Sequence, residues 1–352
     1  MIDKSLRSRY NEGNMSSNLI NSVNTNDKNR EYLFDNLKAI LIILVVWGHL
    51  LASMREQSDV IKGIYFFIFF FHMPAMVFIS GYFSKNLDKI RNNAVVTLLI
   101  PYLILNLIDY FYKILILREE YFGFRFFNPN WGLWYLLTLF LWKFLLKDLI
   151  KIKFILPFSF AFALLSGFSK EFSEYLALGR MVCFLPFFLL GYYATPEHIV
   201  RLRKLPKPLF LLIPVITGVL SAFIVFKDVF DTELLFLRSY YPEGEETRTM
   251  LFRLLIYVVA LAMLAALINL ASEKKSFLTY LGTSTMTVYV LHIFTIPALE
   301  KLELFKNQPY LYLGYSFLMT VLIAFIYSRN TVKRAYDSLM TRLTRLVLMK
   351  EK

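Results

Sequence analysis

The sequence predicts an all-α integral membrane protein, a bundle of about ten transmembrane helices with both termini in the cytoplasm. Three observations lead to this prediction. Hydrophobic residues make up 57% of the 352 positions and charged residues only 18%, whereas soluble domains hold roughly 45–50% and about 25%. The apolar residues form runs close to the length of about 20 residues that crosses a bilayer core. Lys and Arg gather between those runs, mainly on one side.

The apolar runs give the candidate spans in chain order. They cover residues 33–53, 62–83, 94–117, 131–149, 153–169, 179–195, 208–226, 251–271, 277–298 and 310–328. With the N-terminus inside, most of the 39 Lys and Arg residues fall in the cytoplasmic connections, as the positive-inside rule requires. An even number of spans then returns the C-terminus to the cytoplasm.

The chain divides into three regions. Residues 1–30 are polar and rich in Asn and Ser, so we expect a disordered cytoplasmic arm. Residues 31–328 hold the spans. Residues 329–352 place Leu and Met among basic residues, which favours an amphipathic helix on anionic lipid. The net charge of +13 lies in short clusters rather than on an extended basic face, so no nucleic-acid partner is expected.

Ionisable side chains inside the first span are the first functional signal. Such groups cost a few kcal/mol each at membrane depth and therefore mark functional interiors. Lys38 and His49 are eleven residues apart, which places them within about 20° on one helix face and ~16 Å apart along the axis. Asp35 lies one turn before Lys38. In the alternative reading, Lys38 extends to the interface beside Asp35 and His49 lies near the outer headgroups.

Two more histidines fall in predicted spans, His72 in the second and His292 in the ninth. An imidazole titrates near neutral pH and suits a general base or a proton relay. For each ring alone, a hydrogen bond to a neighbouring helix is an equally good account. No acidic residue stands at the spacing of a metal-binding helix motif, so no metal is expected. Asp109 and Lys113, at i and i+4, are expected to form a structural ion pair.

Six segments carry a resemblance to a known family. In chain order they are REYLFDNLKAILIILVVWGHL, FHMPAMVFISGYFSK, LLIPYLI, WGLWYLLTLFLWK, GRMVCFLPFFLLGYY and GTSTMTVYVLHIF. Together they resemble the membrane-bound acyltransferase-3 family over residues 31–328, and especially its fucose 4-O-acetylase-like branch. The family signature is a basic residue, ten residues and a histidine in the first helix, which Lys38 and His49 reproduce. The family's two arginines at the start of the third helix are spaced three apart, whereas Lys89 and Arg91 stand two apart here.

The resemblance implies transfer of an acyl group, usually acetyl, from cytosolic acetyl-CoA to a hydroxyl of an extracytoplasmic glycan or lipid-linked sugar. The setting would be a bacterial plasma membrane. We expect His49 to act as general base, with Asp35 as a second catalytic group. The expected donor-binding cations are Lys38, Lys85, Lys89 and Arg91. The expected acceptor-binding and oxyanion-stabilising residues are His72, Arg180, Ser284, Tyr289 and His292.

Two functions from other classes compete with this one. A glycan exporter or proton-coupled transporter would also use intramembrane ionisable residues, but we find no inverted repeat of broken helices. A structural subunit of a glycan-synthesis complex would leave Lys38, His49 and His292 without a reason to lie in lipid.

Overall fold

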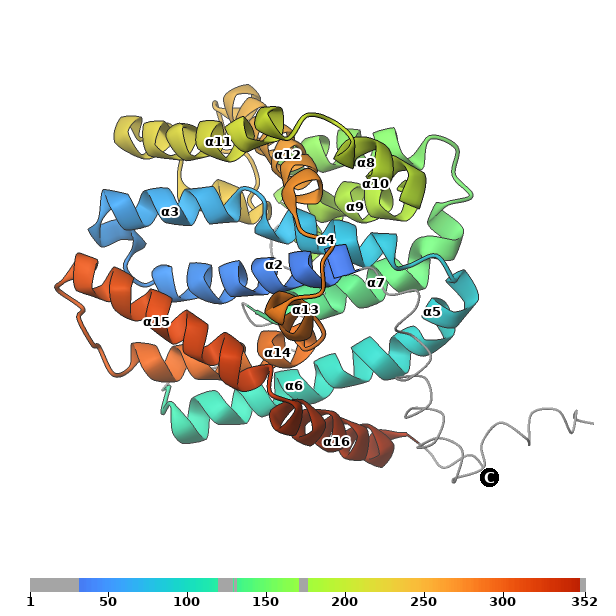
Figure 1. Ribbon diagram of the computed structural model, residues 1–352, viewed down its shortest axis with the longest axis vertical. Coiled ribbons are helices and arrows are strands. Elements are labelled where there is room, and N and C mark those ends of the chain that lie inside the picture. The colour runs from blue at the N-terminus through green and yellow to red at the C-terminus, as the bar shows by residue number, and fades with distance from the viewer. Residues whose placement is uncertain (1–31, 120–128, 130–131, 171–176, 349–352) are drawn as a thin grey trace, which may run out of the picture.

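The computed structural model describes residues 32–119, 129, 132–170 and 177–348, and every regular element in these ranges is helical (Figure 1). The arm expected at residues 1–30 lies outside them. The α-helices are α2 (Tyr32–Leu51), α3 (Asp59–Phe69), α4 (His72–Tyr82), α5 (Leu87–Ala94), α6 (Ile100–Phe111), α7 (Trp134–Leu149), α8 (Ile155–Leu165), α9 (Leu178–Tyr193), α10 (Pro196–Arg203), α11 (Lys207–Lys227), α12 (Glu246–Leu270), α13 (Phe277–Gly282), α14 (Thr285–Glu300), α15 (Pro309–Tyr327) and α16 (Asn330–Val347).

Membrane-length helices make the chain a multi-pass membrane protein. Six stretches in the described part are long and apolar enough to cross a bilayer: Tyr32–Leu51, Asp59–Tyr82, Leu87–Ile116, Lys207–Lys227, Glu246–Leu270 and Pro309–Tyr327. A seventh results if α9 and α10, bent by 94° to each other, are counted together. The spans predicted at 131–149, 153–169 and 277–298 correspond to shorter helices, α7, α8 and α14. The predicted number of crossings, about ten, is therefore larger than the number of described helical stretches that reach full membrane length, which is six or seven.

The first helix, α2, lies inside the bundle. It packs against α3, α4, α13, α14 and α15 (Figure 1). Phe34, Ile42 and Val46, spread along its length, are fully buried. A helix that is apolar on every side is expected in a core, and this position brings Lys38 and His49 into the interior of the molecule. By contrast, α11 and α15 lie at the edges of the view and expose many large apolar side chains.

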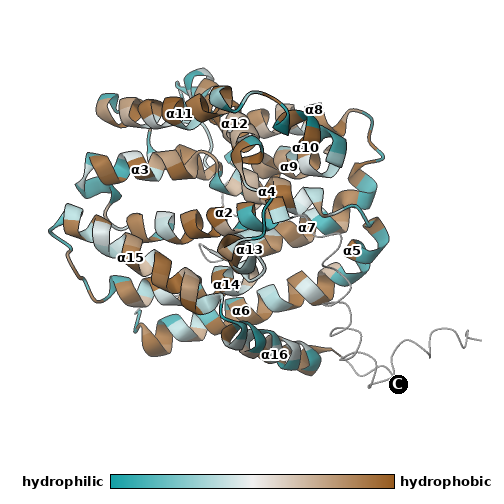
Figure 2. Ribbon diagram, in the orientation of Figure 1, coloured by the Kyte–Doolittle hydropathy of each residue, from teal (hydrophilic) through white to brown (hydrophobic). Residues whose placement is uncertain are grey.

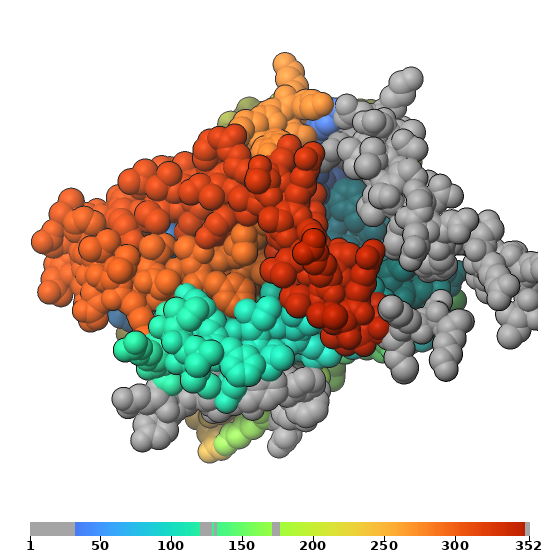
Figure 3. Space-filling view, turned by 90° about the horizontal axis from the view of Figure 1, so that it is seen from below, coloured from blue at the N-terminus to red at the C-terminus, as the bar shows by residue number. Residues whose placement is uncertain are grey.

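The distribution of polar residues follows the same arrangement. Figure 2 shows hydrophobic residues along α11, α12 and α6, and hydrophilic residues concentrated on α5, α10 and α16. The last of these, α16, is a helix as the basic C-terminal pattern predicts, and it lies across α6 beside α15 (Figure 3).

The span predicted at 62–83 corresponds to one membrane-length stretch, Asp59–Tyr82, that is broken between the end of α3 at Phe69 and the start of α4 at His72. Pro74 has no N–H with which to bond the carbonyl one turn earlier, and the helix breaks within that turn. The His72 ring spans the break, with Nδ1 2.8 Å from the Ile68 carbonyl oxygen.

Close contact between α4 and α9 holds the second half of this broken pair. A Cβ on Gly81 would lie 2.9 Å from the carbonyl carbon of Phe188, and a Cβ on Gly191 would lie 2.9 Å from that of Phe78. Small residues allow membrane helices to approach in this way. The crossing fixes α4 relative to α9 and so positions His72, which lies at the start of α4, relative to the first turn of α9.

The ion pair predicted inside the third span is confirmed. Lys113 Nζ lies 3.6 Å from Asp109 Oδ2, and both side chains are buried. Membrane burial makes such a pair a structural requirement, because either charge alone would be costly in this position.

Candidate active site

A cavity of about 340 Å³ opens where six helices and two connections meet. The end of α2, the segment after it, α3, α4, the first turns of α7 and α9, the connection after α11 and the end of α14 all contribute. The lining residues are His49, Ala52, Arg55, Tyr65, Phe69, His72, Met73, Trp134, Arg180, Phe184, Leu235, Phe236, Arg238, Ile296 and Glu300. Three of the residues predicted from the sequence, His49, His72 and Arg180, therefore share one cavity.

His292 lies directly behind the cavity wall. Its ring stacks on that of His49 with the centroids 5.4 Å apart and the planes at 25°. His292 is fully buried and comes from α14, one turn before the lining residue Ile296. The three histidines predicted to lie in the membrane thus form one group.

Hydrogen bonds fix the proton positions of two of these rings. His72 Nδ1 lies 2.8 Å from the Ile68 carbonyl oxygen, and His292 Nδ1 lies 3.2 Å from that of Val288. A carbonyl oxygen only accepts, so each Nδ1 carries the hydrogen and Nε2 is the basic nitrogen of the neutral ring. Both partners lie four residues earlier in the chain, Val288 on the same helix as His292 and Ile68 across the break between α3 and α4.

Tyr289 joins the histidine group to α7. Its hydroxyl donates to the Gly132 carbonyl, and its ring lies 5.8 Å from the rings of both Tyr135 and His292. The Tyr135 hydroxyl lies 2.7 Å from the Ser80 hydroxyl on α4. Tyr289 therefore stands beside the imidazoles, as predicted, although its hydroxyl already donates to a backbone carbonyl.

Ser284 does not join this group. It precedes His292 by eight residues, a distance of ~12 Å along the helix. Its hydroxyl donates to the Ser328 carbonyl at 3.3 Å, which links the start of α14 to the end of α15. Ser284 therefore lies apart from the His49–His292 pair, at the other end of α14.

Lys38 and Asp35 form an ion pair at the beginning of α2, the contact that the alternative reading of Lys38 supposes. Lys38 Nζ lies 2.7 Å from Asp35 Oδ1 and 5.6 Å from the centre of the Phe83 ring. The carboxylate of Asp35 is largely buried. Asp35 precedes His49 by fourteen residues, or ~21 Å of helix, so it can influence the imidazole only indirectly and acts directly on Lys38.

The other predicted donor-binding cations have different surroundings. Lys85 donates to the carbonyls of Gly191, Tyr192 and Ala194 at the end of α9, which occupies the three ammonium protons. Partial burial lowers the pKa of Lys85. Arg91 pairs with Asp148 at 2.9 Å, so it ties α5 to α7. Lys89 is exposed on α5.

Sequence reasoning missed the residues that anchor the inner part of α2. The Asn36 amide donates to the carbonyls of Ser272 and Lys274 at 2.8 and 3.0 Å. Its oxygen accepts from the hydroxyls of Ser276 and Thr279 at 3.1 and 2.8 Å. Four bonds are the full capacity of a side-chain amide. In the sequence, the only sign of this anchor is a polar residue among the apolar residues that begin the first span. The sequence gives no indication of the distant residues that Asn36 contacts.

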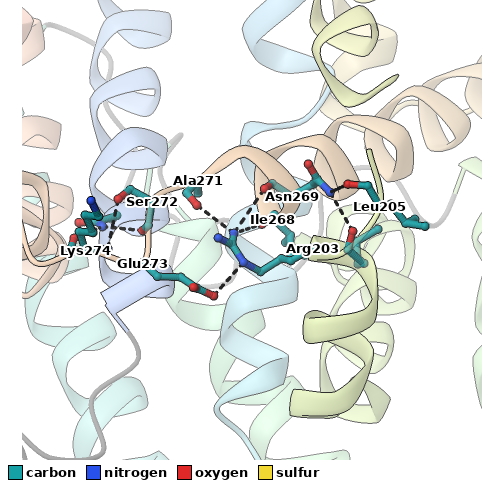
Figure 4. Close-up of polar contacts among 10 residues, drawn as sticks. Arg203, Leu205, Ile268, Asn269, Ala271, Ser272, Glu273 and Lys274 are labelled. Atoms are coloured by element: carbon teal, nitrogen blue, oxygen red, sulfur yellow. Dashed lines mark hydrogen bonds and ion pairs between the residues drawn. The ribbon is translucent and has the colours of Figure 1, made fainter. Parts of the chain in front are cut away.

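Arg203 holds the end of α12 close to this anchor. Its Nη1 donates to the carbonyls of Ile268 and Ala271 at 2.5 and 2.9 Å, and its Nε lies 2.8 Å from Glu273 (Figure 4). The exposed carbonyls of a helix C-terminus favour a cation in this position. Asn269 adds donations to the carbonyls of Leu202 and Leu205. The basic connection after α9 is therefore structural as well as topogenic.

Comparison with known proteins gives two matches. A family model described as "Acyltransferase domain" matches residues 31–329. Nodulation protein NolL of Sinorhizobium fredii (strain NBRC 101917 / NGR234) is 47% identical over 60 residues, which cover 16% of this chain and 16% of that protein. No solved structure matches.

Proposed function

Because the chain belongs to the acyltransferase-3 family, whose model covers residues 31–329, we propose that it transfers acetyl from cytosolic acetyl-CoA to a hydroxyl of an extracytoplasmic glycan. The family and the membrane-length helices identify a multi-pass membrane acyltransferase. Acetyl as the group, coenzyme A as its carrier and a glycan as acceptor belong to the proposal. So does the fucose 4-O-acetylase-like branch, which rests on lysine rather than arginine at position 38.

The observation that carries the proposal is the pairing of His49 with His292 at the wall of the cavity. On the same helix, Lys38 stands ~16 Å from His49. The helix α2 thus carries a cation, Lys38, near its start and an imidazole, His49, near its end, where the cavity lies. A polyanionic thioester donor and a hydroxyl acceptor that arrive from opposite sides of the membrane require these two features.

In the proposed reaction, the hydroxyl oxygen of the acceptor attacks the thioester carbonyl carbon. His49 takes up the proton of that hydroxyl at the same time. The tetrahedral intermediate collapses by breaking the carbon–sulfur bond. The departing thiolate takes up a proton from the imidazolium, which restores neutral His49 and leaves an acetyl ester and free coenzyme A. An imidazole is suited to both transfers because its ordinary pKa lies near neutrality.

We propose the topology that the charge pattern predicts, with ten crossings and both termini in the cytoplasm of a bacterial cell. Lys38 and Lys89 then face the cytosolic pool of acetyl-CoA. Arg55 and Arg238 belong to connections on the outer side, so the cavity opens toward the glycan. The basic α16 lies at the cytoplasmic surface, where anionic lipid attracts it.

The test uses purified protein in proteoliposomes with acetyl-CoA labelled in the acetyl group. Wild type should bind the donor and release or transfer the label. His49→Ala should bind the donor and lose both activities. His198→Ala is the matched control, because His198 caps α10 outside the membrane-spanning helices and should leave them intact.

Two outcomes would contradict the proposal. Full activity in folded His49→Ala would remove His49 from the mechanism. Absence of donor binding in folded wild type would favour the exporter, which predicts glycan movement without a change in acetyl content.

A further inference from the structure

We propose that the acceptor is anionic, a sugar bearing a phosphate or carboxylate that Arg55, Arg180 and Arg238 hold beside His49. This inference rests on the proposed function and names its substrate class. The three arginines come from three separate parts of the chain and all line the same cavity.

Each of these guanidinium groups lies on an aromatic ring that also lines the cavity. Arg55 lies 5.4 Å from the centre of Tyr65, and Arg180 lies 4.8 Å from that of Trp134. Arg238 lies 5.4 Å from the centre of Phe236. Stacking of this kind holds the guanidinium plane in place without using its N–H groups. The cavity is therefore supplied with preorganised donors of the geometry that carboxylates and phosphates accept.

The acidic partners of two of these arginines are exposed and lie outside the cavity. Arg55 Nε is 3.1 Å from Glu56, whose side chain is 57% exposed. Arg238 is 3.0 Å from Glu233, which is 47% exposed. Ion pairs with exposed carboxylates contribute little to stability. An acidic group that enters the cavity can replace them at small cost.

The remaining lining groups suit the sugar itself. Among the described lining residues, Glu300 is the one carboxylate, and it can accept hydrogen bonds from sugar hydroxyls. The rings of Tyr65, Trp134 and Phe236 provide apolar faces for the carbons of the sugar. A neutral glycan would use these rings and Glu300 but would offer no opposite charge to the three arginines.

The experiment measures binding of three matched probes to wild type in nanodiscs of neutral lipid. The probes are p-nitrophenyl glucoside, p-nitrophenyl glucuronide and p-nitrophenyl glucoside 6-phosphate. We expect one of the anionic probes, or both, to bind at least about tenfold more tightly than the neutral one, since charge-assisted hydrogen bonds are the strong ones. Glucuronide preference identifies a carboxylate as the recognised group, and preference for the 6-phosphate identifies a phosphate. Salt should reduce the preference.

Arg55→Gln and Arg238→Gln should each remove most of the anion preference and leave binding of the neutral probe within about twofold. Arg238→Lys keeps the positive charge but loses the paired N–H donors of the guanidinium. Its preference for the anionic probes should therefore lie between those of wild type and Arg238→Gln. Arg248→Gln is the control, because Arg248 pairs with Glu245 and does not line the cavity.

Equal affinity for all three probes, no binding of any, or the same loss in Arg248→Gln would overturn the inference. None of these results depends on acetyl-CoA, whose binding tests the proposed function separately. If the arginines instead held the phosphates of the donor, Arg55→Gln and Arg238→Gln would weaken acetyl-CoA binding and spare the glycosides.

Discussion

The ring of His292 on α14 stacks on that of His49 on α2, with the centroids 5.4 Å apart. The Nδ1 of His292 is occupied by the Val288 carbonyl, so its Nε2 is the nitrogen that can accept a proton. The pair places two imidazoles side by side, His49 at the cavity and His292 behind its wall.

His49→Ala should lower acetyl transfer by about 10²–10⁴-fold, the usual contribution of a general base, with little change in the Kd of acetyl-CoA. His292→Phe keeps a stacking ring but loses the nitrogen. If His292 only packs, this variant should retain the pH profile of wild type; if it relays protons, the profile should change. Turnover measured across pH distinguishes the two.

Lys38→Ala should raise the KM of acetyl-CoA by roughly 10–150-fold, the equivalent of losing one charged hydrogen bond. Because it also leaves the buried Asp35 carboxylate without its Lys38 partner, the variant should be less stable. The double variant Asp35→Asn/Lys38→Ala removes the uncompensated carboxylate and should recover the lost stability. Lys38→Arg keeps the positive charge and should retain acetyl-CoA binding. An unchanged KM in the double variant would return Lys38 to the role of an interface residue.

Asn36→Ala should destabilise the protein by about 2–4 kcal/mol, because four hydrogen bonds made by a buried side chain lose a partner. The midpoint of thermal unfolding in detergent measures the change. Asn92→Ala, an exposed position on α5, should leave the midpoint within error. Equal midpoints for the two variants would mean that the anchor of α2 is not needed for stability.

Gly81→Ala and Gly191→Ala should each destabilise the bundle by about 1–3 kcal/mol or more, because the added methyl group meets backbone across the α4–α9 crossing. Gly63 and Gly218 provide the controls. A Cβ at either meets nothing within 4 Å, so alanine there should be neutral. Melting of all four variants in one detergent gives the comparison, and loss at the control positions would refute the steric explanation.

The hydrogen bond from Lys147 holds the pKa of Asp88 below 3.8. A lowered folded-state pKa contributes stability above the unfolded value and loses it as the pH falls through the folded value. The difference in unfolding midpoint between wild type and Asp88→Asn should therefore be present at neutral pH, shrink as the pH falls below about 4 and vanish below the folded-state pKa. Since both groups are exposed, the difference should also shrink in high salt.

Local spacing could be predicted from the sequence, but distant partners could not. Residues eleven apart on a helix share a face whatever surrounds them, so Lys38 and His49 could be related in advance. The pairing of Asp109 with Lys113 follows from the same geometry. The partners of Asn36 and the stacking of His49 on His292 depend on how helices far apart in the chain pack, which hydropathy does not encode.

The residues whose surroundings were not foreseen illustrate the same limit. Lys85 was expected to face the donor because it is basic and lies at the inner mouth, yet the end of α9 offers it three carbonyls. Ser284 shares a helix with His292 but lies more than two turns away. Arg55 and Arg238 lie in connections between predicted spans, and no motif in the sequence marks them as neighbours across a cavity.

The groups at and behind the cavity wall come from two kinds of segment, packed helices and the connections between helices. His49 and His292 belong to packed helices, whereas Arg55 and Arg238 belong to the connections after α2 and α11. Connections accept substitutions and changes of length far more readily than packed helices do. If these connections select the acceptor, as we propose, then substitutions in them can change that choice while the imidazole pair stays intact. Related enzymes with the same helical bundle can in this way come to use different acceptors. Replacing the two connections with those of a relative would be a direct way to change the acceptor.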